Sequence, residues 1–306
     1  ALEEMDFEYN WFKPTMVAVA NELMSKVAYG VRVRACIGGS VSMLDLVSDT
    51  VIVVEYIATG RNRLAYLLIG MVAANMIFQL LVVWAQTRGL TENRWRTMML
   101  QMLATVLFIK PGLDSWKVAS GAEQLPGATE TPLNEMMYSK ACEMVFEAVP
   151  GFVLQILAIL TAKQRTTRAV VSLLISAAST GLTATTLFYD SDVDPGTRKR
   201  NPVWSGTIPD QGRGLAFATV FTFCTLHVLA KGAATALFYI ANPRFLVIYF
   251  AADYGLYFMY LAARSDVIFY SAMPPTASWI FSPFLRIMMK VVGDFSGSPS
   301  MRLPIM

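Results

Sequence analysis

Residues 35–59 of the chain read ACIGGSVSMLDLVSDTVIVVEYIAT, a segment that is long enough to cross a bilayer and yet carries three acids. A membrane-spanning helix needs about 20 mostly apolar residues. The acids are Asp45, Asp49 and Glu55. Because a charge at bilayer depth is costly, it persists only where it faces a partner helix, a cation or water. The segment therefore predicts a membrane-spanning helix with a polar seam that faces the inside of a helical bundle.

The rest of the chain has the composition of a membrane protein. Of its 306 residues, 55% are hydrophobic and 15% are charged, and the mean hydropathy is +0.47. Apolar stretches recur along the whole length, so we predict an all-α, polytopic helical membrane protein with about eight transmembrane helices. The expected spans are 35–59, 64–86, 97–118, 136–160, 167–189, 214–240, 243–263 and 277–293.

These spans predict a single transmembrane helical domain over residues 35–293, followed by a short tail at 294–306. Residues 1–34 begin with an acidic stretch followed by Trp11 and other apolar residues, and we expect this segment to be amphipathic and to lie at the membrane interface. The Lys and Arg residues of the short loops favour a cytosolic position for both termini. Which membrane holds the protein does not follow from the sequence.

Several functional classes are disfavoured by what the chain lacks. The net charge is only +3 and the basic residues are spread out, so nucleic acid is not an expected partner. No Gly-rich phosphate loop and no nucleophile with a recognisable base stands in the sequence, so neither catalysis nor a cofactor is expected. Cys36, Cys142 and Cys224 show no metal-ligand spacing and are expected to be free buried thiols. The expected partners are membrane lipids and other membrane subunits.

Polar residues recur inside the expected spans at helical spacing. Asp45 and Asp49 stand four residues apart and so share one helix face. Glu143 and Glu147 repeat this arrangement in the fourth span, just before Pro150. A proline within a span frees a backbone carbonyl, which a polar group or water must satisfy. The two acidic pairs therefore predict polar groups facing each other inside the bundle.

Further polar residues complete the candidate set, with Lys231 as an expected counter-charge for the acids. Two interpretations stay open: structural salt bridges that hold the bundle together, or a polar path through the membrane. Carboxylates at this spacing can also surround a hard cation such as Ca²⁺, whereas the di-iron pattern is absent because the chain has one histidine. The metal question is left open. The additional candidates are Glu55, Gln79, Gln155, His227, Lys231 and Asp253.

Three of these segments resemble the XK-related family of membrane proteins. In the first two spans the resemblance rests on SDTVIVVEYIATGR (48–61) and NMIFQLLVVW (75–84). In the fourth span FEAVPGFVLQILAIL (146–160) is similar to the family's Glu-x-x-Pro-Gln-x-x-x-Gln segment, with Glu147, Pro150 and Gln155 in matching places. Gly151 replaces the first Gln of that segment.

The XK-related family includes phospholipid scramblases, in which polar and charged residues form a route for lipid headgroups. The resemblance implies such a role for Asp45, Asp49, Glu147 and Gln155. The leading expectation is therefore an energy-independent phospholipid scramblase. An ion or proton pathway built on the same acids, or a structural subunit of a larger membrane complex, remains an alternative.

Overall fold

The computed structural model describes residues 11–90, 94–122, 124, 126–127, 131–162, 166–193, 207–208, 212–265 and 275–296. Within these ranges every regular element is a helix, which confirms the all-α prediction. A 3₁₀ turn, η1 (Thr87–Gly89), follows α3, and a π-helical turn, η2 (Met144–Ala148), joins α6 to α7. The helices are α2 (Phe12–Ala58), α3 (Asn62–Gln86), α4 (Arg94–Val106), α5 (Lys110–Ser120), α6 (Pro132–Glu143), α7 (Val149–Leu160), α8 (Thr167–Val193), α10 (Arg213–Ala241), α11 (Pro243–Ala263) and α12 (Pro275–Ser296).

The described helices include six stretches that are long and apolar enough to cross a membrane. The multi-pass membrane architecture is thus supported by length and composition, and the described residues contain six such stretches where about eight spans were predicted. The six stretches are Val33–Ala58, Asn62–Gly89, Pro132–Leu160, Thr167–Asp190, Arg213–Ala241 and Pro243–Ala263.

The predicted third span, 97–118, is not one continuous helix, because the chain breaks in its middle. Phe108 adopts a left-handed backbone with φ of 60°, and α5 starts two residues later with Pro111 in its first turn. The resulting helices α4 and α5 have 13 and 11 residues. At 1.5 Å per residue they are about 20 and 17 Å long, too short for a hydrocarbon core of about 30 Å.

The predicted eighth span, 277–293, lies within α12, which is not among the six apolar stretches. Two features interrupt its apolar character: Pro283 inside the helix and Arg286, which is buried. The final turns of α12 instead enter the protein core, where Val292 and Phe295 are buried. We therefore describe α12 as a core-packing helix and not as a further span.

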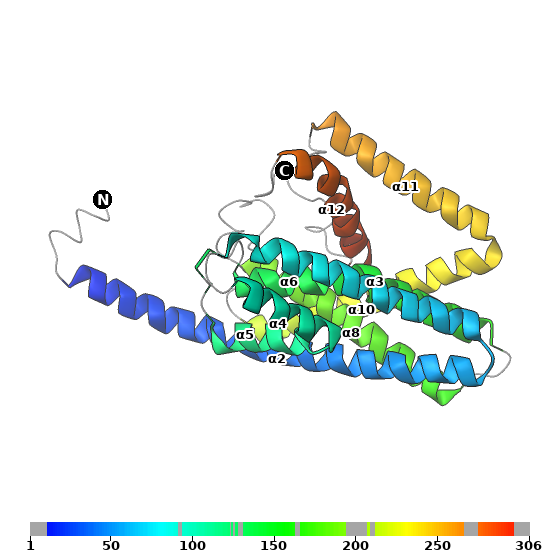
Figure 1. Cartoon of the computed structure of the whole chain (residues 1–306), viewed down its shortest axis with the longest axis horizontal. Coiled ribbons are helices and arrows are strands. Elements are labelled where there is room, and N and C mark those ends of the chain that lie inside the picture. Colours follow the sequence, from blue (N-terminus) through cyan, green and yellow to red (C-terminus); the bar gives the residue numbers. More distant parts are fainter. Residues whose placement is uncertain are drawn as a thin grey trace.

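Side-chain contacts set the direction of the helices around α2, which runs along the length of the bundle (Figure 1). Gly38 of α2 faces Lys140 of α6, and farther along Asp49 is hydrogen-bonded to Gln155 of α7. The α6–α7 unit therefore runs parallel to α2. Ser48 is hydrogen-bonded to Ser172 at the start of α8, so α8 runs antiparallel to α2 and brings its last turns back to the beginning of the bundle.

Helices α4 and α5 form a hairpin with the geometry of a re-entrant segment, and we call it the re-entrant hairpin. Gly112 lies beside Met43 of α2, and Ser115, one turn later, lies beside Gly39, so α5 runs back towards the start of α2. At the end of α5, Lys117 pairs with Glu135 in the first turn of α6 at 3.6 Å. The chain thus enters the bundle along α4 and leaves it along α5 at the same end. Non-helical backbone at membrane depth is tolerated where protein or a water-filled cavity surrounds it.

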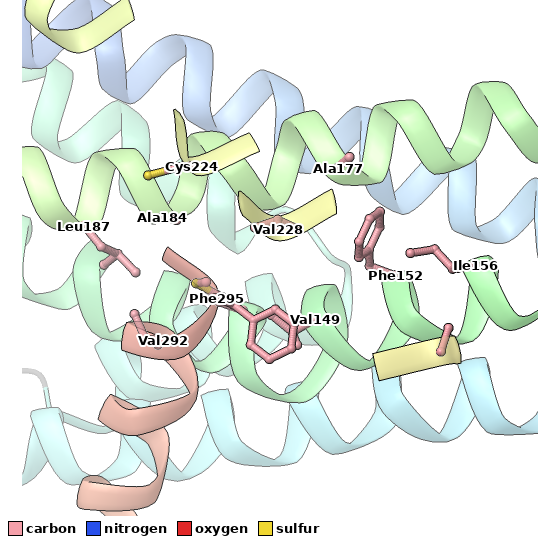
Figure 2. Packing of buried hydrophobic residues seen from close by; sticks show 12 residues of the cluster. Val149, Phe152, Ile156, Ala177, Ala184, Leu187, Cys224, Val228, Val292 and Phe295 are labelled. Carbon is pink, nitrogen blue, oxygen red and sulfur yellow. The ribbon is translucent and has the colours of Figure 1, made fainter. Parts of the chain in front are cut away.

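The hydrophobic core lies between α7, α8, α10 and α12 (Figure 2). Phe152 of α7 packs against α10, where a Cβ placed on Gly232 would lie 2.5 Å from the ring. Gly181 of α8 is pressed against Thr225 of α10 in the same way. Small residues let helix backbones approach closely in membrane proteins, where packing provides much of the association energy. The core therefore fixes the positions of α7 and α8, which both contribute to the polar site.

Two predicted boundaries fall within or beyond these elements. The boundary at residues 34 and 35 lies inside α2, which is one continuous helix from Phe12 onwards. The interfacial position of residues 1–34 stays a prediction, and residues 1–10 lie outside the described part. Of the predicted tail, residues 294–296 complete α12, and residues 297–306 are likewise outside the described ranges.

Candidate intramembrane polar site

The two predicted acidic pairs come together inside the bundle. Asp45 interacts electrostatically with Glu143, and Asp49 with both Asp45 and Glu147. Glu147 in turn lies within range of Glu143 and Asp45. The bundle itself buries three of these acids: the exposed fractions are 7% for Asp45, 5% for Asp49 and 8% for Glu143. We call these four residues the acid cluster.

Amide side chains from two neighbouring helices hydrogen-bond to the acid cluster. Gln155 of α7 donates from Nε2 to Asp49 Oδ1 at 2.8 Å. Asn75 of α3 donates from Nδ2 to Glu147 Oε2, and Gln79 donates to Asn75 Oδ1 at 3.0 Å. The predicted residues Gln79 and Gln155 therefore adjoin the cluster. Asn75 was not predicted, although its position four residues before Gln79 on the same helix face was a usable signal.

The helix that carries Glu143 and Glu147 is distorted at the turn that joins α6 to α7, and Glu147 lies within this turn. Pro150 has no backbone N–H, and its ring crowds the carbonyl four residues earlier, at Phe146. The turn from Met144 to Ala148 is correspondingly widened to a π-helix. Such π-turns occur often at functional sites. Phe146 within this turn stacks on Phe78 of α3 with 3.9 Å between ring centroids, which holds the turn against the helix that supplies Asn75.

A buried lysine, which the sequence analysis did not single out, lies beside the acid cluster. Lys140 stands one turn before Glu143 and is 3% exposed, and its Nζ has no hydrogen-bond partner in the part of the chain that the structure describes. Its position is set by Gly38 of α2, where a Cβ would lie 2.5 Å from the ammonium group. Glu143 is its strongest electrostatic partner. The spacing of Lys140 and Glu143, at i and i+3 on one helix face, was the available signal.

A small polar cavity of about 30 Å³ adjoins the acid cluster. It is closed on one side by the tip of the re-entrant hairpin, where Phe108 and Lys110 line it. A cavity of this size holds about two water molecules. Its other polar lining groups come from α2, α3, α4, α6 and the π-turn: Ser42, Asn75, Gln79, Thr105, Glu143 and Glu147.

The hairpin carries charged residues next to the cavity, and these residues form ion pairs with one another within α5. Lys110 is 2% exposed, and its Nζ lies 2.6 Å from Asp114 Oδ2 one turn along α5. Lys117 lies 3.7 Å from the other oxygen of Asp114. The positive charge of Lys110 is therefore already matched within α5, although its side chain borders the cavity.

Four predicted residues lie elsewhere. Glu55, near the end of α2, accepts a hydrogen bond of 2.7 Å from Thr166. His227 Nε2 lies 2.8 Å from the carbonyl oxygen of Asp294, and Lys231 lies 5.9 Å from the Tyr249 ring centroid. These two, with Asp253, belong to a separate group between α10, α11 and α12. Lys231 is thus not placed beside the acids as their expected counter-charge.

Asp253 is held by a lysine of α12. Lys290 Nζ lies 2.8 Å from Asp253 Oδ2 and 3.2 Å from Asp294 Oδ2. The rings of Tyr254 and Tyr257 flank the same ammonium group, each with its centroid at 5.3 Å. This arrangement ties α11 to α12 and is separate from the acid cluster.

The described residues contain no group of three or more His, Cys, Asp or Glu side chains that could hold a metal ion. The Ca²⁺ interpretation of the acidic pairs therefore gains no support from this part of the chain. All three cysteines are free; Cys142 and Cys224 are buried as expected, but Cys36 is exposed because it lies on the outer face of α2.

Comparison with known proteins adds no assignment. No protein-family model matches the chain, and no curated protein is significantly similar to it.

Proposed function

We propose that the protein is a multi-pass membrane protein that moves phospholipids between leaflets without an energy source, with the acid cluster as part of the headgroup path. One observation carries this proposal: the three separate segments that resemble XK-related proteins meet at one place. Asp49 of the first segment is hydrogen-bonded to Gln155 of the third, and Glu147 of the third to Asn75 of the second.

The chemistry of the cluster suits a zwitterionic headgroup. A headgroup that crosses the hydrocarbon core needs polar groups to replace its lost hydration, and buried polar residues within spans commonly mark such pathways. The carboxyl oxygens of Asp49 and Glu147 can accept hydrogen bonds from an amine, and when the groups are ionised they can also interact with a quaternary ammonium. The absence of a nucleotide-binding signature from the sequence supports a passive process.

The test is a lipid-flip assay on the purified full chain in liposomes that carry a fluorescent phospholipid in both leaflets. A membrane-impermeant reductant should bleach the inner-leaflet label of liposomes containing the protein and spare it in protein-free liposomes. Asp49→Ala and Glu147→Ala should slow the bleaching, whereas Glu55→Ala, outside the acid cluster on the same helix as Asp49, should not. Wild-type protein that leaves the inner leaflet protected would refute the proposal.

An ion or proton pathway is the second candidate function. The excess of acidic over basic groups in the cluster supports it. Four carboxylates lie together, and Lys140 is the nearby cation that forms no ion pair within 4 Å in the described part. An ion-flux measurement on the same liposomes separates the two functions. A third outcome, neither flipping nor flux with stability lost in the Ala variants, would favour a structural subunit.

A further inference from the structure

Two buried oxygen atoms at the acid cluster lack hydrogen-bond donors. Among the described residues, Asp45 Oδ1 and Gln155 Oε1 have no hydrogen-bond partner, although the Gln155 amide nitrogen donates to Asp49. Gln155 is 2% exposed, so bulk water does not reach it within the chain. A buried acceptor without a donor is costly, and nearly all such atoms in proteins are satisfied by a partner or an ordered molecule. Serine hydroxyls do supply hydrogen bonds to the cluster: Ser176 and Ser179 bond to Asp45, and Ser42 bonds to Glu143. Asp45 Oδ1 and Gln155 Oε1 nevertheless remain without a donor among the described residues.

The surrounding cations do not neutralise the cluster either. Two of them are matched by acids of their own, Lys110 by Asp114 at 2.6 Å and Arg34 by Asp190 at 2.7 Å. Lys140 remains, and it faces Glu143. The neighbouring helices α3 and α7 contribute the amides of Asn75, Gln79 and Gln155, and α8 contributes hydroxyl groups. The titratable and charged groups around the cluster are Arg34 and Tyr56 of α2, Lys110 and Asp114 of α5, Lys140 of α6 and Asp190 of α8.

We propose that the acid cluster is a proton-binding site, in which Asp45, Asp49 and Glu147 hold protons while Glu143 remains the charged partner of Lys140. A protonated carboxyl both donates and accepts a hydrogen bond, so it supplies the missing donors and removes the repulsion between neighbouring acids. Glu143 and Glu147 also line the small cavity, which lies between the cluster and the tip of the hairpin and has room for about two water molecules.

The inference of proton binding does not depend on the proposed function. The effect of proton binding on transport does rest on the proposed function. If the cluster is also part of a lipid path, the path carries fewer negative charges when protons are bound. Flipping of lipids would then change with pH over the range in which the cluster titrates. A chain that binds protons but moves no lipid would refute the proposed function and leave this inference intact.

The first test compares two acids of the cluster with Asp114, a buried acid that is paired with Lys110 at 2.6 Å. Asp45→Asn and Glu147→Gln imitate the protonated side chains, and Asp114→Asn is the matched control because it breaks the buried pair with Lys110. Full-length variants in lipid nanodiscs at neutral pH are compared by their thermal unfolding midpoints. The first two should stay within about 3 °C of the wild type, while Asp114→Asn should fall by about 6 °C or more. Equal losses in all three variants would overturn the proposal.

The second test observes the protons directly. Infrared spectroscopy of the purified full chain should show a carbonyl band of protonated carboxyl groups that shifts in D₂O. The band should weaken in Asp45→Asn and Glu147→Gln and persist in Asp114→Asn. Absence of the band from the wild type would overturn the inference. A change in the thermal unfolding midpoint of the wild type when choline replaces sodium in the buffer would also overturn the inference. Such a change would indicate that the cluster holds a metal cation.

Discussion

Arg34 and Asp190 form an ion pair of 2.7 Å across 156 residues of sequence, joining the early part of α2 to the last turns of α8. Both side chains are largely buried, and the guanidinium group also lies 4.4 Å from the centroid of the Tyr189 ring. The Tyr189 ring meets Phe217 of α10 edge to face. One arginine thus fastens three helices at the end of the bundle where α2 enters it.

Breaking this pair should destabilise the protein. Asp190→Asn leaves a buried guanidinium group without its charged partner, and we expect a loss of about 3–5 kcal/mol in the free energy of unfolding. The measurement is denaturant unfolding of the purified chain in detergent, followed by tryptophan fluorescence. The exchanged double variant, Arg34→Asp with Asp190→Arg, should recover part of the loss. A single variant as stable as the wild type would show that the pair contributes nothing.

The contact between Gly181 and Thr225 provides a second prediction. Because a Cβ on Gly181 would overlap Thr225, including its Cα at 2.8 Å, Gly181→Ala must push α8 and α10 apart. We expect a loss of about 1–3 kcal/mol. Gly70→Ala is the matched control, since the same added methyl group on α3 meets nothing within 4 Å. The measurement is the unfolding midpoint of each variant. Equal midpoints for Gly181→Ala and Gly70→Ala would contradict the prediction.

The re-entrant hairpin leads to a prediction about topology. If α4 and α5 enter and leave at one end of the bundle, Gly127 lies on the same side of the membrane as the amino terminus, and Gly60 lies opposite. Eight spans would place Gly127 on the opposite side. Single cysteines at these positions, in a variant without the three natural cysteines, can be labelled with an impermeant reagent. Labelling of Gly127→Cys from the same side as Gly60→Cys would exclude the hairpin.

The position of the termini can be tested in the same samples. The Lys and Arg distribution predicts a cytosolic amino terminus. In the six-span arrangement the loop that carries Arg198, Lys199 and Arg200 joins it on the cytosolic side, whereas the loop that carries Lys163, Arg165 and Arg168 moves to the opposite side, so the overall charge bias changes little. Protease protection of tags at the two ends should show both on the cytosolic side. Tags on opposite sides would exclude this arrangement.

The attachment of α11 gives the last prediction. Asp253 is its charged link to α12, through Lys290, while most of the other large side chains of α11 point outwards. Asp253→Asn should therefore widen the distribution of distances between spin labels at Met259 and Ile287, both of which are exposed. Glu55→Gln, which changes a carboxylate on a different helix, serves as the control. An unchanged distribution would mean that the ion pair is not needed, because the contacts of Tyr254 and Tyr257 with Lys290 and the contacts with α10 hold α11 in place.

Local patterns in the sequence were sufficient for the helical class and for much of the acid cluster. The four-residue spacings of Asp45 with Asp49 and of Glu143 with Glu147 directly determine which face each acid occupies. Pro150, three residues after Glu147, is likewise a local signal for the distorted turn at Met144–Ala148. These features depend on residues that are close together in the chain.

Features that depend on distant contacts were missed. The apolar stretch 97–118 has no glycine at the position where it breaks, and Phe108 adopts a left-handed backbone that hydropathy does not reveal. The burial of Lys140 depends on the missing side chain of Gly38, about a hundred residues earlier. The separation of Lys231 from the acids depends on how α10 packs against its neighbours, which one sequence alone does not specify.

The α4–α5 hairpin also bears on how such a chain can change over evolutionary time. A segment that returns to the side from which it came does not alter the parity of membrane crossings. Loss or gain of the whole hairpin would therefore leave every later loop on its original side. Loss of one of the six spans would invert all the loops that follow, so that spans can be exchanged only in pairs, whereas the hairpin can be exchanged alone.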